Sequence, residues 1–234
     1  MVVSKEYLPQ IKPGSNNQLR NYIDAIRNNN VQVLSASEVL RKEVIIRLKN
    51  AIRKLYREDK ILLSHKMNEV TVCGRLAIYL QNQFKDFNGY YIDVEYYMLS
   101  VPPDEYQGGN KGRIRCDILF HSRGYYGCRA DILMALEAKY TPEGIRGRAD
   151  RKRLEKLTAL YNPNIPSNAV HSTLVGVFLR FNEHGGNMSF YSSGVEKEII
   201  EFKAKKRCVY EKDKGNHFDN IKLTFRKRSI LSRH

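Results

Sequence analysis

Two acids and a lysine stand in short apolar segments where ionisable side chains are uncommon. Asp117 occurs in Arg-Cys-Asp-Ile-Leu-Phe, and Glu137 and Lys139 occur in Leu-Glu-Ala-Lys-Tyr. Residues two apart in a β-strand share a face, so Glu137 and Lys139 point the same way. The segment between the two strands contains two glycines, is typical of a hairpin turn, and would place Asp117 opposite Glu137. We therefore expect two acids and a lysine to converge on one spot.

This grouping could do chemistry or only stabilise a sheet. A hard cation such as Mg²⁺ takes oxygen ligands, and two carboxylates with a backbone carbonyl leave coordination positions for water and a phosphate. A lysine beside the metal can orient or deprotonate the attacking water. The alternative is a structural ion pair, because charges inside a sheet usually find a partner or water. The two segments alone leave both interpretations open.

A helix upstream adds a third acid. Its buried stripe follows helical spacing through Cys73, Leu76, Ala77, Leu80 and Phe84. Glu69 stands four residues before Cys73, so it lies on the same stripe at the first turn. A core-facing acid needs a cation or a metal nearby, although an acid at a helix N-terminus is also stabilised by the helix dipole.

The remaining segments predict a mixed α/β fold. We expect a strand over 90–98 before the two charged strands, and an amphipathic helix over 148–161 after them. The near-continuous apolar run 172–181 is typical of a central strand covered on both faces. The predicted order is helix, three strands, helix, strand.

This order, with acids at those positions, resembles the PD-(D/E)XK nuclease superfamily over roughly residues 65 to 182. The chain is most similar to small bacterial members, through Glu69, Arg75-Leu76-Ala77-Ile-Tyr79-Leu80, Val94-Glu95-Tyr96, Asp117-Ile-Leu-Phe-His121, Glu137-Ala-Lys139 and Lys156-Leu157. Cys116 departs from the pattern, because it stands where the family name has proline.

The resemblance implies an α/β, restriction-endonuclease-like αβββαβ core, in which helices flank a mixed sheet. It also implies Mg²⁺-dependent hydrolysis of phosphodiester bonds, with Mn²⁺ as an expected substitute. Asp117 and Glu137 would hold the metal with the carbonyl of Ala138, and Lys139 would position the water. Glu69 would support a second metal or the hydration shell.

The charge of the chain favours a polyanionic partner. The formal net charge is +15, and basic residues cluster in 146–153, 203–207 and 226–228. The first cluster follows the strand that carries Lys139, so we expect it to contact nucleic acid, whereas the last could equally be a solvated face. The predicted nucleic-acid-binding residues are Arg115, His121, Arg146, Arg148, Arg151, Lys152 and Arg153. For His121 a structural or surface role is the alternative.

The sequence contains no long apolar span, lipidation motif or secretory signal, so we expect no membrane partner and a cytoplasmic location. The four cysteines are dispersed and lack metal-ligand spacing, which is typical of reduced thiols.

We expect the chain to be divided into two parts. Residues 1–64 would form an N-terminal helical extension packed on the core, with helices over 18–28 and 37–56. Residues 65–234 would form the nuclease domain with a basic C-terminal extension, in which 186–226 is helix or added strands. The second helix would serve as a lid, a dimerisation surface or a DNA-contacting extension, so a homodimer stays open.

The predicted function is a Mg²⁺-dependent nuclease acting on DNA in restriction, defence, a mobile element or repair. One alternative is a non-catalytic nucleic-acid-binding or interaction protein on the same fold, and another is an RNA-cleaving toxin. Endonuclease and exonuclease activity are not distinguished by the sequence.

Overall fold

The computed structural model describes residues 33–87, 89–99, 113–123, 132–140, 145–159, 173–209 and 218–228. The helices are α2 (Val33–Glu58), α3 (Lys60–Ser64), α4 (Glu69–Gln83) and α5 (Ile145–Ala159). The strands are β1 (Tyr91–Leu99), β2 (Arg113–His121), β3 (Ile132–Tyr140), β4 (Thr173–Asn182), β5 (Gly185–Ser192), β6 (Val195–Val209) and β7 (Phe218–Arg228). The helix expected over 18–28 lies outside the described residues.

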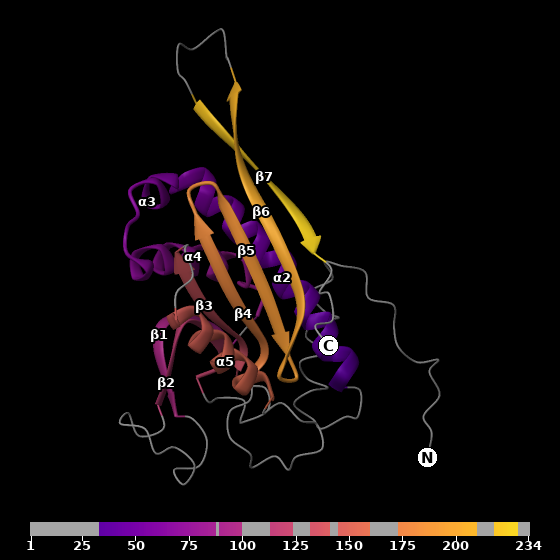
Figure 1. The fold of residues 1–234 in the computed structure, drawn as a ribbon. Helices are drawn as coiled ribbons and strands as arrows, with labels where there is room; N and C mark the ends of the chain where they lie inside the picture. Colours follow the sequence, from indigo (N-terminus) through magenta and orange to yellow (C-terminus); the bar gives the residue numbers. More distant parts are fainter. Residues whose placement is uncertain are drawn as a thin grey trace, which may run out of the picture.

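The strands form one seven-stranded mixed sheet in the order of the chain, β1 to β7 (Figure 1). Neighbouring strands are antiparallel except β3 and β4, which are parallel. A parallel pair needs a crossover connection, and α5 lies in that connection. The mixed α/β class is confirmed, and α4-β1-β2-β3-α5-β4 reproduces the predicted order of elements.

The sheet is larger than the predicted core. The region 186–226, for which helix and added strands were both open, contains β5, β6 and β7, and these continue the same sheet beyond β4. In Figure 1 the β6–β7 ribbon extends well past the other strands. Residues 200, 202, 204 and 221, 223, 225 are buried or half-buried, so this part of the chain follows the two-residue period of a strand with one covered face.

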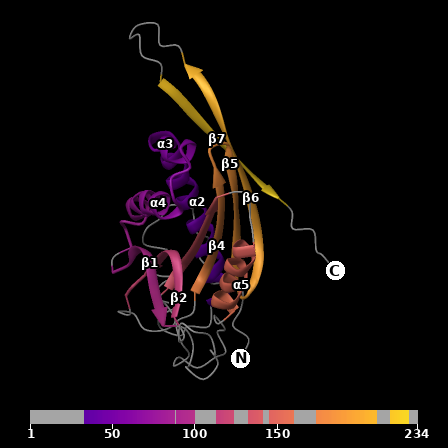
Figure 2. The ribbon, with the colours of Figure 1, turned by 60° about the vertical axis from the view of Figure 1, so that its left-hand side comes forward.

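Helices cover both faces of the sheet. Helices α2 and α4 lie on one face, and α5 lies on the other (Figure 2). The main hydrophobic core joins α2 and α4 to the sheet through side chains such as Leu48, Leu76, Val177 and Phe202. A second, smaller cluster lies under α5 and includes Ala135, Leu154, Phe178 and Tyr191. The described part of the expected N-terminal extension, α2 and α3, therefore packs into the same core as the sheet.

Among the described residues, no helix is long and apolar enough to cross a membrane.

Candidate active site

The β2–β3 hairpin brings the two acids together. Ile118 pairs with Leu136 and Leu119 with Ala135, so the same register places Asp117 opposite Glu137. The Asp117 carboxylate accepts a hydrogen bond of 2.7 Å from the backbone N–H of Ala138. Because Ala138 packs into the main core while Ala135 packs under α5, Glu137 faces α5.

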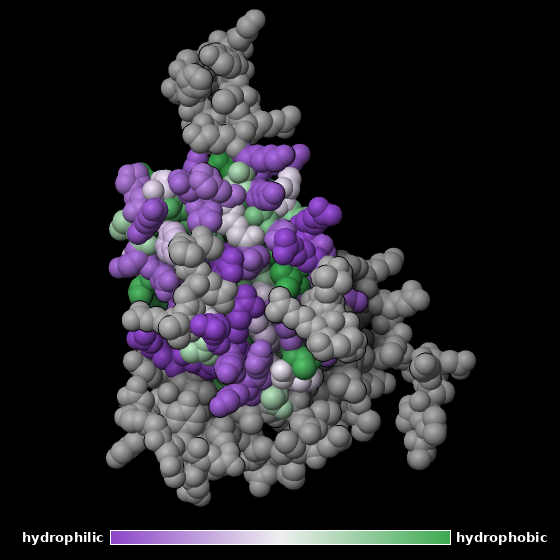
Figure 3. All heavy atoms as spheres, in the orientation of Figure 1, coloured by the Kyte–Doolittle hydropathy of each residue, from purple (hydrophilic) through white to green (hydrophobic). Residues whose placement is uncertain are grey.

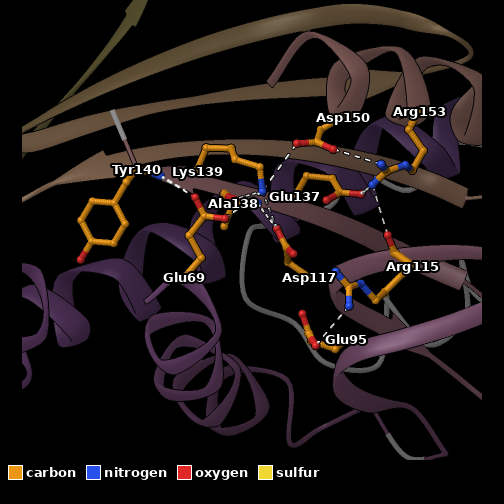
Figure 4. A network of polar contacts seen from close by, with 10 residues as sticks. All are labelled: Glu69, Glu95, Arg115, Asp117, Glu137, Ala138, Lys139, Tyr140, Asp150 and Arg153. Atoms are coloured by element: carbon orange, nitrogen blue, oxygen red, sulfur yellow. Dashed lines mark hydrogen bonds and ion pairs between the residues drawn. The ribbon is translucent and has the colours of Figure 1, made fainter. Parts of the chain in front are cut away.

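The ammonium group of Lys139 lies at the centre of a cluster of oxygen atoms (Figure 4). Its Nζ atom donates to Glu69 Oε2 at 3.0 Å and to the Ala138 carbonyl at 2.8 Å. It also lies 3.6 Å from Asp117 Oδ2 and 3.5 Å from Asp150 Oδ2. These oxygens come from α4, β2, β3 and α5, so the cluster forms only when the whole core is assembled.

A second cation, Arg153 of α5, neutralises the other carboxylates. Its guanidinium forms an ion pair with Glu137, whose side chain is only 2% exposed. The same group lies 3.1 Å from Asp150 Oδ1 and donates to the backbone carbonyl of Arg115 at 3.2 Å. Lys139 and Arg153 together therefore offset only part of the charge of the four acids that converge between β2, β3 and the helices α4 and α5.

Burial controls the protonation of Glu137. It raises the pKa of this carboxyl to about 8, Arg153 opposes the rise, and the neighbouring Asp117 and Asp150 carboxylates add to it. Full ionisation of Glu137 at neutral pH therefore needs more positive charge against it than the guanidinium of Arg153 supplies.

Lys139 is held in its charged form. Burial lowers its pKa, but the Asp117 and Glu69 carboxylates outweigh burial, so the net shift of the pKa is upward. Of the two roles considered for this lysine, orienting water and deprotonating it, the geometry favours orienting, because a protonated amine cannot accept a proton.

Local structure at the start of α4 positions Glu69. Asn68 caps the helix, since its side chain accepts a hydrogen bond of 2.8 Å from the N–H of Thr71. Glu69 then begins the helix, and its Oε1 atom accepts a 3.3 Å hydrogen bond from the N–H of Tyr140. The predicted stripe from Cys73 to Phe84 is buried. The Glu69 carboxylate joins the first turn of this helix to the last residues of β3.

Sequence reasoning missed Asp150. This residue is buried, lies near both cations, and its Oδ2 atom has no hydrogen-bond partner within the described part of the chain. A signal was present, because Asp150 precedes the inward-facing Leu154 by one helical turn. The surrounding run of arginines concealed an acid on the buried side of the helix.

Three of the residues expected to bind nucleic acid have other partners. His121 is buried, its Nε2 atom lies 2.9 Å from Asp93 Oδ2, and its ring packs against Tyr96. Arg151 lies over the ring of Phe178 and is half-buried.

Arg151 also donates to the Tyr191 hydroxyl and to Glu196, both at 3.1 Å, so it fixes α5 to the sheet. Arg153 contacts the buried acids Glu137 and Asp150. These contacts give the three side chains structural partners, and their contact with phosphate stays a prediction.

The other predicted contacts remain at the surface. Arg148 and Lys152 are exposed on α5, and the side chain of Arg146 lies outside the described residues. Arg115 is exposed, and its guanidinium lies 3.5 Å from Glu95 Oε2. Glu95 has a positive φ of 50°, a conformation that is uncommon outside glycine, and is directed toward this end of the site in Figure 4.

The donor types around Lys139 suit a hard divalent cation. Carboxylates of Asp117, Glu69 and Asp150 and the carbonyl of Ala138 are the oxygen ligands that Mg²⁺ prefers. Within the described ranges, no three His, Cys, Asp or Glu side chains are gathered as a ready metal-binding group. A metal would therefore take oxygens that now surround the lysine ammonium, and Asp150 Oδ2, which has no hydrogen bond among the described residues and lies 3.5 Å from Lys139 Nζ, would be available to it.

Comparison of the chain with protein-family models, with curated proteins and with solved structures finds no match. The assignment of function therefore depends on the geometry of the site itself.

Proposed function

We propose that this protein is a metal-dependent nuclease that hydrolyses phosphodiester bonds in DNA, on a restriction-endonuclease-like core made of α4, β1 to β3, α5 and β4. The single observation that carries the proposal is the oxygen cluster around Lys139. It combines Asp117, Glu69 and the Ala138 carbonyl beside the buried Glu137. The order of elements and the charge of +15 support the same proposal.

The proposed metal is Mg²⁺, with Mn²⁺ as a substitute. Asp117, Glu137 and the Ala138 carbonyl would hold it, and Glu69 would contribute to a second ion or to bound water. When bound, such an ion stabilises the extra charge of the pentacovalent phosphate and lowers the pKa of its bound water.

The residues of the chain have distinct roles around that ion. Lys139 stays protonated and donates hydrogen bonds, so it would orient the attacking water and balance charge at the phosphate. Asp150 holds the lysine from the α5 side, at 3.5 Å. Arg153 opposes the rise in the pKa of Glu137 that burial causes, so it favours the ionised form that would bind the metal.

One observation favours a second candidate, a non-catalytic nucleic-acid-binding protein. Lys139 and Arg153 already pair with the acids of the site, which is also what a purely structural ion network would show. The two candidates differ in one property. A structural network loses stability when an acid is neutralised, whereas a metal site loses metal affinity.

The experiment that tests the proposal uses the purified full chain. Supercoiled plasmid, linear duplex, single-stranded DNA and RNA are each incubated with Mg²⁺, Mn²⁺ or EDTA. We expect cleavage of DNA that requires a divalent ion. Calorimetric titration of the protein with Mg²⁺ provides a readout independent of cleavage. Absence of both metal binding and cleavage would favour the non-catalytic candidate, and cleavage of RNA alone would favour the RNA-cleaving alternative.

A further inference from the structure

Helix α5 covers only part of its face of the sheet. Its C-terminal half packs near Gly176, through Thr158 and Leu154, and Arg151 lies over Phe178. Beyond the strand row that contains Phe178, the same face carries polar side chains. In Figure 1 the upper parts of β4 to β7 extend past α5 on this side.

The pairing of the strands traces a continuous row across that open area. Lys139 pairs with Arg180, Arg180 with Asn187, Asn187 with Glu201, and Glu201 with Arg226. Directly paired residues share a face of the sheet. The row therefore runs from the candidate active site to the outermost strand on one side of the sheet.

The next rows are more basic. Lys203 pairs with Thr224, and Lys205 pairs with Lys222, and all four side chains are exposed. Two like charges directly opposite each other destabilise a sheet. Within the described part of the chain, no carboxylate pairs with Lys203, Lys205 or Lys222. Among the described residues, these lysines therefore carry positive charge that an external anion would neutralise.

Glu201, the acidic residue in these rows, already forms an ion pair within the protein. Glu201 Oε1 lies 3.0 Å from Nε of Arg228, which leaves Arg226 without an ion pair among the described residues. The opposite face of the ribbon is apolar, because Phe202, Leu223 and Phe225 pack toward α2. We call the side chains of Arg180, Lys203, Lys205, Lys222 and Arg226 the basic face, and Figure 3 shows hydrophilic residues gathered over this part of the molecule.

Within the described part of the chain, no exposed aromatic side chain lies beside the basic face. Among the described residues, the large exposed aromatic side chains are Tyr91 and Tyr96, both in β1 at the other edge of the sheet. Proteins that bind single-stranded nucleic acid combine basic grooves with aromatic side chains on which bases stack. A basic surface without such side chains suits the phosphate backbone of a duplex.

We propose that the basic face binds the backbone of duplex DNA and directs it along the sheet to Lys139. This inference rests on the proposed function for the reaction at that end of the track, and it differs from the sequence-based expectation, which placed DNA on α5. The basic face supplies binding affinity through its positive charge, whereas the acids around Lys139 supply the hydrolysis.

The test is binding of a labelled duplex in EDTA, measured by fluorescence anisotropy over a range of salt concentrations. The variant carries Lys203→Gln, Lys205→Gln and Lys222→Gln. We expect at least tenfold weaker binding and a shallower dependence of log K on log salt, by about 0.9 for each phosphate that the variant no longer neutralises. Because two of the lysines repel each other, we expect the thermal midpoint of unfolding to stay the same or rise.

The matched control removes the same charge from the other side of the sheet. It carries Lys42→Gln, Arg57→Gln and Lys85→Gln, which lie in α2 and just after α4 and are exposed. We expect its affinity to change by less than a factor of three. Equal weakening by the two triple variants would overturn the proposal, and so would equal affinity of the wild-type protein for single strands and duplex. The variant that loses duplex binding should still bind metal. Failure of the basic-face proposal is therefore distinguishable from failure of the proposed function.

Discussion

The Lys139 ammonium lies 3.0 Å from the carboxylate of Glu69, although the two residues are 70 positions apart. This contact joins the first turn of α4 to the last residues of β3. The contact explains the acid at the start of α4. The Glu69 carboxylate balances the half-buried ammonium group of Lys139 and remains partly exposed to solvent. The helix dipole alone would not require the side chain to reach β3.

The first prediction concerns Glu69. Glu69→Gln keeps the shape and the acceptor for Tyr140, but it removes the charge. We expect a higher Mg²⁺ concentration for half-maximal cleavage with little change in thermal unfolding. If the acid only favours the helix dipole, the variant should instead lose about 0.3–1 kcal/mol of stability with unchanged metal dependence.

The second prediction concerns the buried pair of Glu137 and Arg153. Arg153→Met removes the partner of a carboxyl group that is 2% exposed and raises the pKa of Glu137 further. This group then stays protonated with an unsatisfied hydrogen bond, so the free energy of unfolding at pH 7 should fall by about 1–3 kcal/mol. The double variant Glu137→Met with Arg153→Met should recover most of that loss, because no buried polar group is left without its partner.

Urea denaturation of the wild type, each single variant and the double variant measures this coupling. An additive double variant would show that the two side chains are energetically independent. Recovery of stability in the double variant without recovery of cleavage separates a structural role of the pair from its role at the metal.

The third prediction concerns Lys139. Lys139→Met removes the ammonium from the oxygen cluster, so a cation that competes with the metal for the carboxylates is gone. We expect Mg²⁺ binding to be retained or tightened in calorimetry while DNA cleavage is abolished. Duplex binding in EDTA should fall by less than a factor of three, because the proposed affinity resides in the basic face. Loss of Mg²⁺ binding in this variant would contradict the competition between lysine and metal.

The fourth prediction separates His121 from the site. Arg123 holds the pKa of Asp93 below its ordinary value of 3.8, burial opposes this shift, and His121 reinforces it. A depressed carboxyl pKa contributes stability above the unfolded pKa, and this contribution disappears as the pH falls through the folded pKa. Asp93→Asn should therefore destabilise the protein by about 1 kcal/mol at pH 7, and by less below pH 3.8.

The cleavage rate of folded Asp93→Asn protein should equal the wild-type rate, because this pair does not contact the acids around Lys139. Denaturation at pH 7 and at acidic pH, with a plasmid assay at pH 7, measures both properties. A loss of cleavage at unchanged stability would instead favour the predicted contact of His121 with nucleic acid.

Sequence periodicity predicted the parts of the site that depend on local geometry. The two-residue period of a strand and the hairpin register place Asp117, Glu137 and Lys139, and helical spacing places Glu69. The same helical spacing contained Asp150, but a basic run dominates that segment. The charge composition of this segment does not show which of its basic side chains face the sheet, so Arg151 and Arg153 were predicted to contact nucleic acid, and their contacts within the protein were not foreseen.

The extent of the sheet was less predictable. Residues 186–226 contain apolar pairs such as Ile199 and Ile200, which fit helix and strand alike. Only pairing with β4 and β6 decides that β5 is a strand, and pairing is a property of distant segments. The charged rows of the basic face follow from that pairing, so the sequence alone did not bring Lys205 beside Lys222.

The central claim is tested most directly by the rate of plasmid cleavage by Asp117→Asn in Mg²⁺. Asparagine keeps the shape and still accepts the hydrogen bond from the Ala138 N–H, while the charge that would bind metal is gone. Asp93→Asn, purified in the same way, controls for contamination and for loss of an acid elsewhere in the sheet. We predict that Asp117→Asn protein is folded, binds duplex in EDTA and does not cleave. Cleavage by Asp117→Asn at the wild-type rate would contradict the assignment of the active site.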